Sequence, residues 1–330
     1  MKCFYYSRYR FYNQNAKHEL KFFLISDIHF SNKVKSDCLR AITEQARQKQ
    51  PNYILIAGDI IDALSTVDND SDLKRLTSWL EQLGKIAPVL IELGNHDFYR
   101  KNPAHNNIFS KKRHWFAEKN QRYIDALNAI ENVQLLDNQV YEDKNVYIFG
   151  FTQSPDYFQF DRDERRGTTI FHPGGEDLDI MLSDLDKVDQ KLITNLPKNK
   201  VKIAIIHSPI YLDDPQVAAK LYEFDYFISG HMHNGVVPPV LHDLWRSDRG
   251  IIAPGKKLFP RGARAKIASP YDKTILLGAV STIQASAKPI TFVNGIFPTH
   301  IATLELSKRE TLARKPDVSH QYLSYQSSKS

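Results

Sequence analysis

The segment LKFFLISDIH, residues 20–29, decides the fold, because an apolar run of strand length ends there in an aspartate and a histidine. Short runs rich in Ile, Leu and Phe that polar residues bound are typical of buried β-strands. Four further runs share this design, and Asp, Asn or His follows each of them within two residues. They are NYILIA (52–57), PVLIEL (88–93), VKIAII (201–206) and FDYFIS (224–229).

The segments between these strands carry apolar residues at helical spacing. They are residues 36–50, 72–86, 121–132, 179–195 and 215–223. Further strands are expected at 145–151, 274–280 and 301–306, with the last two as candidates for a second sheet. Alternating strands and helices predict βαβ units and a largely parallel sheet. Ligands of open α/β sheets bind outside the carboxyl ends of the strands, so we expect the five polar strand ends to form one site.

The domain organisation predicted from these patterns is a single domain over residues 20–306. The irregular, polar and aromatic segment near 98–118 is typical of a lid-like insertion. Residues 1–19 are expected to form an N-terminal arm. Residues 307–330 are polar, and we expect them to form a mobile tail.

Composition limits the function classes. The chain has 330 residues, 42% of them hydrophobic, which is typical of a globular protein. A net charge of +6 is compatible with an anionic substrate or an acidic membrane surface, but it is not a nucleic-acid signature. The two cysteines, Cys3 and Cys38, cannot form a disulfide framework. No apolar run approaches the roughly 20 residues that span a bilayer, and the first residues lack a signal peptide. We therefore expect a cytoplasmic location, with membrane association left open.

The polar strand ends offer the ligands of a metal site. Carboxylate, imidazole and amide oxygen suit hard or borderline divalent metals, and these strand ends contain no thiolate. The candidates outnumber the four ligands of one tetrahedral ion, so they predict two ions, which in hydrolases lie about 3.5–4 Å apart. The candidate metal-ligating residues are Asp27, His29, Asp59, Asn95, His207, His231 and His233.

The order of the motifs along the chain resembles a known family. The sequence carries D-x-H at 27–29, G-D-x-x-D at 58–62, G-N-H-D at 94–97, His207 and G-H-x-H at 230–233. This set is similar to that of the calcineurin-like metallophosphoesterase superfamily, and the chain resembles a bacterial-type member without an assigned substrate. The resemblance implies an α/β sandwich of four layers. Two stacked β-sheets would be flanked by helices, with the metal site at the C-terminal ends of the strands.

The same resemblance implies a role for each candidate. Asp27, His29, Asp59 and His233 would hold one metal, and Asp59 would bridge to a second metal completed by Asn95, His207 and His231. The cofactors would be two divalent ions, of Mn, Fe or Zn. The implied reaction is hydrolysis of a phosphate ester by a metal-bridging hydroxide, with His96 as the general acid. Asp62 would orient His96 by a hydrogen bond.

Departures from the family pattern narrow the substrate. Phosphoprotein phosphatases carry an arginine directly after G-D-x-x-D and a glutamate after G-N-H, where this chain has Ala63 and Asp97. Lipid A precursor pyrophosphatases carry an arginine where His96 stands. What remains resembles a bacterial-type phosphodiesterase or phosphomonoesterase. The leading prediction is a phosphodiesterase that acts on a small-molecule, nucleotide or lipid-linked phosphodiester.

A basic segment at 255–266 is a candidate substrate contact. It would bind a second anionic group, a headgroup or a nucleotide, and a solvated basic loop is the equally weighted alternative. The candidate substrate-binding residues are Lys256, Lys257, Arg261 and Arg264.

Two alternative functions remain open on the same fold. One is a metal-dependent nuclease, although nucleic acid is the less favoured partner because the chain has no extended basic stripe. The other is a scaffold or membrane-surface adaptor without catalysis. Peripheral contact with a membrane or lipid headgroup fits the basic charge, and the sequence does not predict the oligomeric state.

Overall fold

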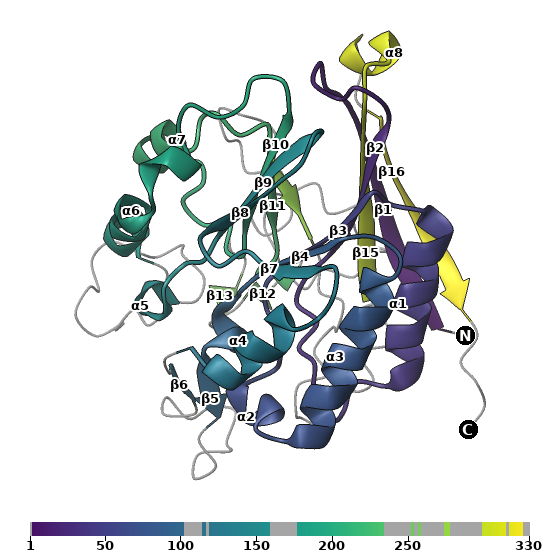
Figure 1. Ribbon diagram of the computed structural model, residues 1–330, viewed down its shortest axis with the longest axis vertical. Coiled ribbons are helices and arrows are strands. Elements are labelled where there is room, and N and C mark those ends of the chain that lie inside the picture. The colour runs from purple at the N-terminus through teal and green to yellow at the C-terminus, as the bar shows by residue number, and fades with distance from the viewer. Residues whose placement is uncertain are drawn as a thin grey trace.

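Two β-sheets pack face to face at the centre of the molecule, with helices on both outer faces (Figure 1). The structure is a computed structural model that describes most of the chain. The described residues are 2–101, 114–116, 119–158, 177–233, 252–253, 257–258, 274–277, 299–314 and 317–325. The resulting four layers confirm the predicted α/β sandwich.

The larger sheet has seven strands in the order β16-β1-β15-β2-β3-β4-β7. Its strands are β1 (Lys2–Tyr12), β2 (Leu20–Ile25), β3 (Tyr53–Ala57), β4 (Val89–Glu92), β7 (Val133–Leu135), β15 (Thr299–Ser307) and β16 (Asp317–Tyr325). Strands β2, β3, β4 and β7 are parallel, so their carboxyl ends meet at one edge. β15 runs antiparallel to β2, β1 runs parallel to β15, and β16 runs antiparallel to β1.

The smaller sheet has five strands in the order β14-β11-β10-β9-β8. Its strands are β8 (Gln139–Glu142), β9 (Val146–Phe151), β10 (Val201–Ile206), β11 (Tyr226–Ser229) and β14 (Thr274–Leu276). All are parallel except β8, which forms an antiparallel pair with β9. Two short antiparallel pairs join β5 (Tyr99–Lys101) to β6 (His114–Phe116) and β12 (Ile252–Ala253) to β13 (Lys257–Leu258).

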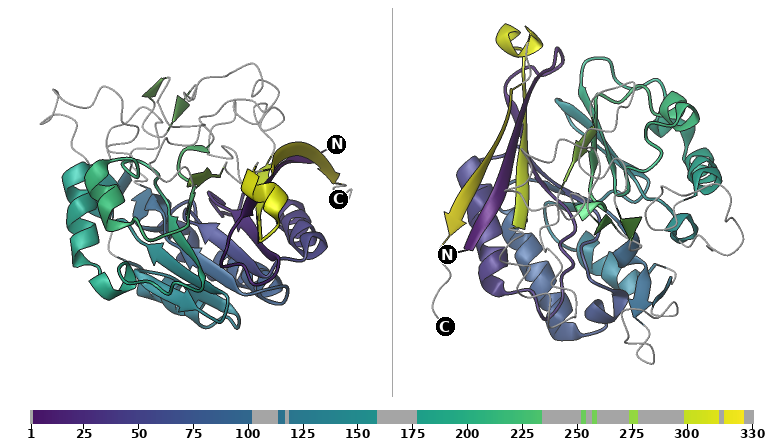
Figure 2. Two further views of the ribbon diagram at one scale, coloured as in Figure 1. Left: turned by 90° about the horizontal axis from the view of Figure 1, so that it is seen from above. Right: turned by 180° about the vertical axis from the view of Figure 1, so that it is seen from behind.

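Helices cover both outer faces, as Figures 1 and 2 show. α1 (Ser36–Lys49), α3 (Asp70–Gly84) and α4 (Gln121–Asn128) lie on the larger sheet. α5 (Pro155–Phe158), α6 (Leu178–Lys187) and α7 (Pro215–Lys220) lie on the smaller one. The short helices α2 (Leu64–Val67) and α8 (Glu310–Arg314) follow β3 and β15. The predicted helices are therefore present with bounds that differ by a few residues, except that the one predicted at 179–195 ends at Lys187 and is followed by a separate 3₁₀ turn, Gln190–Leu192.

Three apolar cores hold the layers together, one between each pair of neighbouring layers. Alternate residues of β4 show the principle, because Val89 and Ile91 pack under the helices while Leu90 packs between the sheets. The third core lies between the smaller sheet and its helices, around Phe149 and Leu185. Side chains of successive strand residues point to opposite faces, so these unbroken apolar runs bury both faces of each sheet.

The structure differs from the sequence prediction at both ends of the chain. Residues 2–12 are strand β1 inside the larger sheet, where Phe4 and Tyr6 are buried, and are not an arm outside the domain. Residues 317–325 form β16 on the outer side of β1, so a mobile tail is the wrong description for them. The 301–306 strand lies in the first sheet, between β1 and β2, and only β14 joins the second. Among the helices of the described residues, none is long and apolar enough to span a membrane.

Candidate metal centre

The predicted ligands converge where the carboxyl ends of both sheets meet. Asp27 and His29 follow β2, Asp59 follows β3, and Asn95 begins a short 3₁₀ turn after β4. The smaller sheet contributes His207 after β10, and His231 and His233 after β11. The two sheets stack with these ends together, so side chains from five strands meet in one place.

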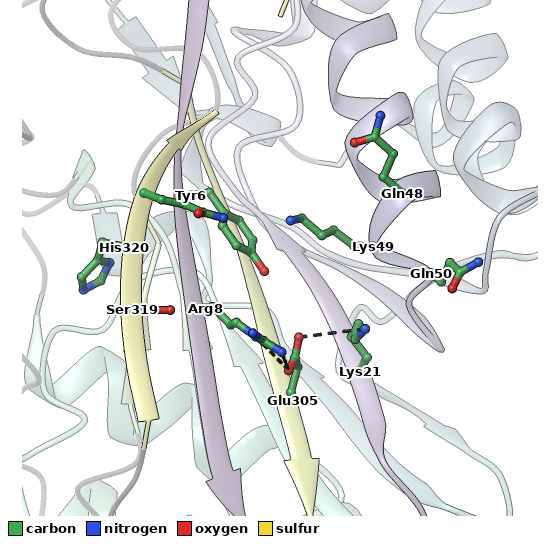
Figure 3. A pocket seen from close by; sticks show the side chains of 10 residues that line it. Tyr6, Arg8, Lys21, Gln48, Lys49, Gln50, Glu305, Ser319 and His320 are labelled. Carbon is green, nitrogen blue, oxygen red and sulfur yellow. Dashed lines mark hydrogen bonds and ion pairs between the residues drawn. The ribbon is translucent and has the colours of Figure 1, made fainter. Parts of the chain in front are cut away.

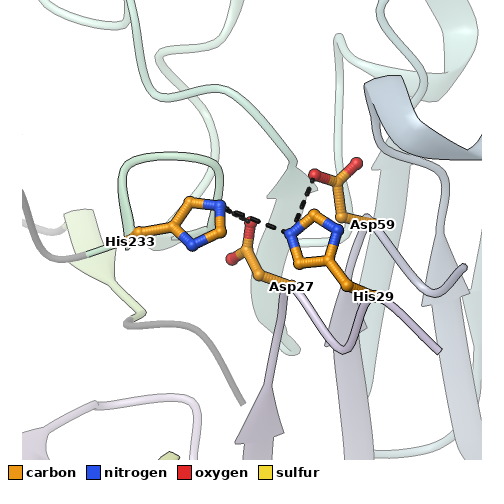
Figure 4. A group of neighbouring side chains, drawn as sticks. All are labelled: Asp27, His29, Asp59 and His233. Carbon is orange, nitrogen blue, oxygen red and sulfur yellow. Dashed lines mark hydrogen bonds and ion pairs between the residues drawn. The ribbon is translucent and has the colours of Figure 1, made fainter. Parts of the chain in front are cut away.

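A first cluster joins Asp27, His29, Asp59 and His233, each of which places one ligand atom within 4.8 Å of the others (Figure 4). The Nε2 atoms of His29 and His233 lie 3.4 Å apart. His233 Nε2 lies 3.4 Å from Asp27 Oδ1, and His29 Nε2 lies 3.7 Å from Asp59 Oδ2. Ligand atoms around one tetrahedral ion at about 2.0–2.2 Å are separated by roughly 3.3 Å, so this donor set fits a metal ion.

A second cluster shares Asp59 with the first and adds His207 and His231. His207 Nε2 lies 3.3 Å from Asp59 Oδ1 and 3.2 Å from Asn95 Oδ1. The two oxygens of Asp59 thus face different clusters, Oδ2 toward His29 and Oδ1 toward His207. The donor set of the second cluster consists of imidazole nitrogen, carboxylate and amide oxygen, which fits the same class of borderline divalent metals.

The backbone at the site is strained. Ten non-glycine residues of the described chain have positive φ, and five of these are predicted ligands. The five are Asp27 (51°), His29 (45°), Asp59 (51°), His231 (64°) and His233 (46°). Such a conformation costs about 1–3 kcal/mol for a residue with a side chain, although Asp and His tolerate it better than most. This concentration indicates that the fold holds these side chains at the site against local preference.

Close packing beneath the ligands explains a glycine in the G-D-x-x-D motif. Gly58 has φ of +79°, and a Cβ added there would collide with the ring of His207. The His207 ring is fully buried, and its Nδ1 donates to the carbonyl oxygen of Ala57 (2.8 Å). That hydrogen bond leaves Nε2 as the atom facing Asp59, as in metal-ligating histidines whose other nitrogen is fixed by a carbonyl.

The electrostatics of the centre favour a cation. Burial alone would lower the pKa of His207, but Asp59 and Asp27 outweigh it and raise that pKa to about 10. Burial alone would raise the pKa of Asp59, but His207 and His96 hold it well below its ordinary value. Without a metal, a proton on His207 thus compensates the carboxylates. Burial lowers the pKa of His233 to about 4, so its imidazole is neutral and has a lone pair to donate.

Two ligand histidines have one nitrogen each without a hydrogen bond. Nδ1 of His29 and Nδ1 of His233 are buried, and neither has a partner among the described residues. Their Nε2 atoms face each other across the first cluster. Two imidazole nitrogens this close can both direct a lone pair at one ion, so a shared cation between them matches the geometry.

His96 lies beside the clusters and differs from the ligands in its contacts. Its Nε2 is 3.9 Å from Asp59 Oδ2, and its Nδ1 donates to Asp62 through the backbone carbonyl oxygen (2.9 Å). The prediction assumed a hydrogen-bonded carboxylate. The Asp62 carboxylate also lies close to His29 and His96, with which it forms a third cluster. Burial lowers the pKa of His96 well below its ordinary value, against the raising effect of Asp59.

Three further residues of the site lie outside the predicted ligands and the predicted acid. Asp97 accepts hydrogen bonds from the backbone N–H groups of Gly94, Ile60 and Ile61, so it ties the G-N-H-D loop to the Asp59 loop. Ser26 hydrogen-bonds to the Asp27 carboxylate. Glu92 is fully buried at the end of β4, and neither carboxylate oxygen has a hydrogen-bond partner among the described residues. A charge inside PVLIEL is the signal that could have revealed Glu92.

The predicted substrate contacts lie largely outside the described residues. This applies to Lys256, Arg261 and Arg264, whereas Lys257 begins the short strand β13 and only its backbone is described. The predicted insertion is described only at its two ends, where β5 pairs with β6. The substrate contacts and the lid therefore stay predictions.

Comparison with protein families gives a match that covers the whole centre. The model of the calcineurin-like phosphoesterase family matches residues 20–235, which include every predicted metal ligand. An uncharacterised metallophosphoesterase of Campylobacter jejuni is 24% identical over 227 residues, or 69% of this chain and 47% of that protein. One from Helicobacter pylori strain J99 is 22% identical over 221 residues, or 67% of this chain and 46% of that protein. The chain thus spans about half the length of these curated relatives.

Comparison with solved structures matches, among others, a dimetal phosphatase from Danio rerio. The two chains are 18% identical, the match covers 65% of this chain and 82% of the phosphatase, and the TM-score is 0.38. The protein TT1561 of Thermus thermophilus is 11% identical, covers 64% of this chain and 81% of its own, and has a TM-score of 0.39.

Proposed function

Because the chain belongs to the calcineurin-like phosphoesterase family, we propose that it is a metal-dependent phosphoric ester hydrolase that cleaves a phosphodiester. The observation that carries this proposal is the Asp59 carboxylate, whose two oxygens face two separate ligand clusters. A shared carboxylate allows a hydrolase to hold two cations close enough to act on one phosphate.

Each cluster would hold one divalent cation. Asp27, His29, Asp59 and His233 would form the first site, and Asp59, Asn95, His207 and His231 the second. When bound, the two cations would activate a water for attack on phosphorus and offset the charge that builds on the phosphate oxygens. Nitrogen and oxygen donors suit Mn, Fe and Zn alike, and the choice among them is part of the test.

His96 would protonate the departing oxygen of the ester. The hydrogen bond from Nδ1 to the Asp62 carbonyl fixes the ring and leaves Nε2 as the atom nearest Asp59. Although the pKa of His96 is low in the buried, metal-free site, the negative charge of a bound phosphate ester would raise it toward the range an acid needs. No covalent enzyme intermediate is needed.

The absence of a long basic side chain at one position supports a diester over a monoester. Ala63 lies directly after the G-D-x-x-D motif and is 1% exposed. Phosphoprotein phosphatases of the superfamily carry at this position an arginine that binds phosphate. A phosphodiester has one negative charge fewer than a monoester dianion, so it depends less on such a cation. Small-molecule, nucleotide and lipid-linked diesters all satisfy this chemistry.

The test combines metal content with hydrolysis. We expect the purified chain to bind about two divalent ions, measured by mass spectrometry of the elements, and to hydrolyse bis(4-nitrophenyl) phosphate with added Mn²⁺. Asp59→Asn should reduce both the metal content and the rate by roughly 10²-fold or more, because it weakens both clusters.

Asp186→Asn is the matched control, since among the described residues this exposed carboxylate on α6 pairs with Lys220 and belongs to neither cluster. It should change neither readout. A protein that stays metal-free and inert with Mn²⁺ would contradict the proposal. An Asp59→Asn variant with full activity would do the same, and efficient cleavage of single-stranded DNA would identify the diester as a nucleic acid.

A further inference from the structure

A cavity lies at the opposite end of the larger sheet from the metal centre. It has a volume of about 340 Å³ and is formed by β1, β2, β15, β16 and the end of α1 (Figure 3). Lys21, near the start of β2, lines it, whereas the metal ligand Asp27 follows the other end of that strand. None of its lining residues belongs to the proposed catalytic machinery.

Three cations line this cavity against one carboxylate. Arg8, Lys21 and Lys49 face Glu305, and Figure 3 shows Arg8, Glu305 and Lys21 in a row across three neighbouring strands. The strand register places Lys21 and Arg10 on either side of Glu305, and Arg8, two residues before Arg10 on the same face of β1, reaches the same carboxylate. The formal charge of the lining is therefore +2.

Glu305 fixes one of these cations in place. Its carboxylate is buried, and Oε2 accepts hydrogen bonds from Arg8 Nε (2.9 Å) and Nη2 (2.7 Å). Arg8 Nη1 has no hydrogen-bond partner among the described residues. Lys21 Nζ lies 4.0 Å from Glu305 Oε1, at the limit of an ion pair. The carboxylate is thus shared among several cations and neutralises only one of them.

Lys49 has no carboxylate partner within the described part of the chain. Its ammonium lies 4.0 Å from the centre of the Tyr6 ring. Burial lowers the pKa of Lys49, and the positive charges of Arg8 and Lys21 lower it further, while Glu305 acts in the opposite direction. Arg8 and Lys21 therefore repel the charge of Lys49, whereas the same two cations would attract an anion in the cavity.

The C-terminal end of α1 offsets only part of the positive charge of the cavity lining. Gln50 caps the helix at its C-terminus, where the carbonyl groups carry about half a negative charge. Subtracting that from the formal +2 still leaves more than one uncompensated positive charge. The positive charge of the lining exceeds what Glu305 and the helix end compensate together. Such an excess favours binding of an anion with more than one charge.

We propose that this cavity binds a small phosphorylated molecule through Arg8, Lys21 and Lys49. Its volume lies at the lower end of the range for small-molecule sites, about 300–1,000 Å³, so it suits a phosphate group with a short attached moiety. An anchored guanidinium with a free N–H and two ammonium groups matches the oxygens of phosphate. The site is separate from the catalytic one, so it does not depend on the proposed hydrolysis.

The location can be tested by diffraction. Crystals of the full chain with its metals, soaked in tungstate as a phosphate analogue, should show anomalous density between Lys49, Lys21 and Arg8, apart from any density at the metal centre. In calorimetric titrations with inorganic phosphate, Lys49→Gln and Lys21→Gln should each weaken binding at this cavity by about tenfold or more. Lys85→Gln, an exposed lysine at the end of α3, should not.

The outcomes separate this proposal from the proposed function. Hydrolysis of bis(4-nitrophenyl) phosphate should be unchanged in Lys49→Gln, since Lys49 is remote from the metal centre. Lysine-dependent binding of glycerol 3-phosphate indicates a soluble ligand, and lysine-dependent binding to vesicles containing phosphatidic acid indicates a lipid headgroup. Tungstate density only at the metal centre would overturn the proposal, as would phosphate affinity that neither lysine variant changes.

Discussion

Asp59 combines burial, a left-handed backbone and contacts to both ligand clusters. It is fully buried, its backbone is left-handed, and its two oxygens face different clusters. Its Oδ1 also accepts a hydrogen bond from the backbone N–H of His96 (2.7 Å), which couples the ligand to the loop that carries the proposed acid. A change at Asp59 should therefore affect both ions and the acid together.

The proposed acid can be separated from the metals by its leaving-group dependence. We expect His96→Asn to slow hydrolysis of an alkyl phosphodiester by about 10²–10⁴-fold, because an alkoxide needs a proton to depart. The loss should be much smaller for bis(4-nitrophenyl) phosphate, whose nitrophenolate leaves unprotonated. Steady-state kinetics on both esters provide the measurement.

His18→Asn, at an exposed histidine, is the matched control and should leave both rates unchanged. Metal content should also be unchanged in His96→Asn, since His96 is not among the proposed ligands. Equal loss on both esters would assign His96 a structural role instead.

Glu92 should make stability depend on pH. Burial raises its pKa well above the ordinary 4.5, so the folded metal-free chain keeps it protonated where the unfolded chain ionises. The free energy of unfolding of the metal-free chain therefore decreases as pH rises above 4.5, because the unfolded chain releases the Glu92 proton more readily than the folded chain. In Glu92→Gln that contribution is absent, and the melting temperature should fall less between about pH 5 and pH 8 than in the parent chain.

The exposed Glu81, on α3, offers the comparison for this prediction. Glu81→Gln should follow the pH dependence of the parent chain. Parallel curves for the parent and Glu92→Gln, measured by thermal unfolding with a chelator present, would show that Glu92 is ionised in the folded state.

At this scale the sequence predicted which residues meet but not how they are held. The motif residues Asp27, Asp59 and His207 could be assigned because each closely follows an apolar run. The carbonyl that fixes His96 and the N–H groups bound to Asp97 belong to the backbone, so residue types alone do not indicate them. The positive φ values at the ligands likewise depend on loop closure between sheets.

Among the elements, β9 shows how closely the sheets approach each other. A Cβ added at Gly150 would collide with the carbonyl oxygen and Cβ of Leu136, which packs between the two sheets. We expect Gly150→Ala to lower the free energy of unfolding by about 1–3 kcal/mol, as overpacking of a close-packed core does. Urea denaturation measures this change.

Gln139 is paired with Gly150 across the β8–β9 ladder but is exposed. Gln139→Ala should therefore stay within about 0.5 kcal/mol of the parent chain. A Gly150→Ala variant as stable as the Gln139 control would mean that the sheets can separate locally without cost.

Local periodicity explains why most elements were predictable. Helices such as α3 carry Leu73, Leu76, Leu80 and Leu83 at helical spacing, and all four are buried. The spacing also identifies the face of α3 that is buried. Sheet membership is different, because apolar runs do not specify their neighbours, and β15 was accordingly expected in the wrong sheet.

For the whole molecule, the two ends of the chain complete the larger sheet. β1 is covered on its outer side by β16, where Tyr5 stacks on His320 with ring centres 5.5 Å apart. The first residues were not predicted as a strand because Arg8 and Arg10 interrupt their aromatic residues, so they contain no long unbroken apolar run. Their partners also lie almost the whole chain away, as in the pairing of Phe4 with Thr299.

Removing residues 317–330 should expose β1 as an edge strand. We expect a lower melting temperature and concentration-dependent association, because an eleven-residue strand would present unpaired backbone groups to other chains. Light scattering after size-exclusion chromatography measures the association. Removing only residues 326–330, beyond the end of β16, is the control and should cause neither effect, whereas a monomeric, equally stable chain after the longer deletion would refute the expectation.

The pairing of β1 with β15 also has a consequence for biosynthesis. At about 5–20 residues per second, the ribosome makes the partner of Phe4 roughly 15–60 s after Phe4 itself. During that interval the aromatic stretch FYY at residues 4–6 has no strand to pair with on either side. In the nascent polypeptide this aromatic segment is therefore exposed unless a chaperone binds it. The larger sheet can therefore close only after β15 and β16 have been synthesised.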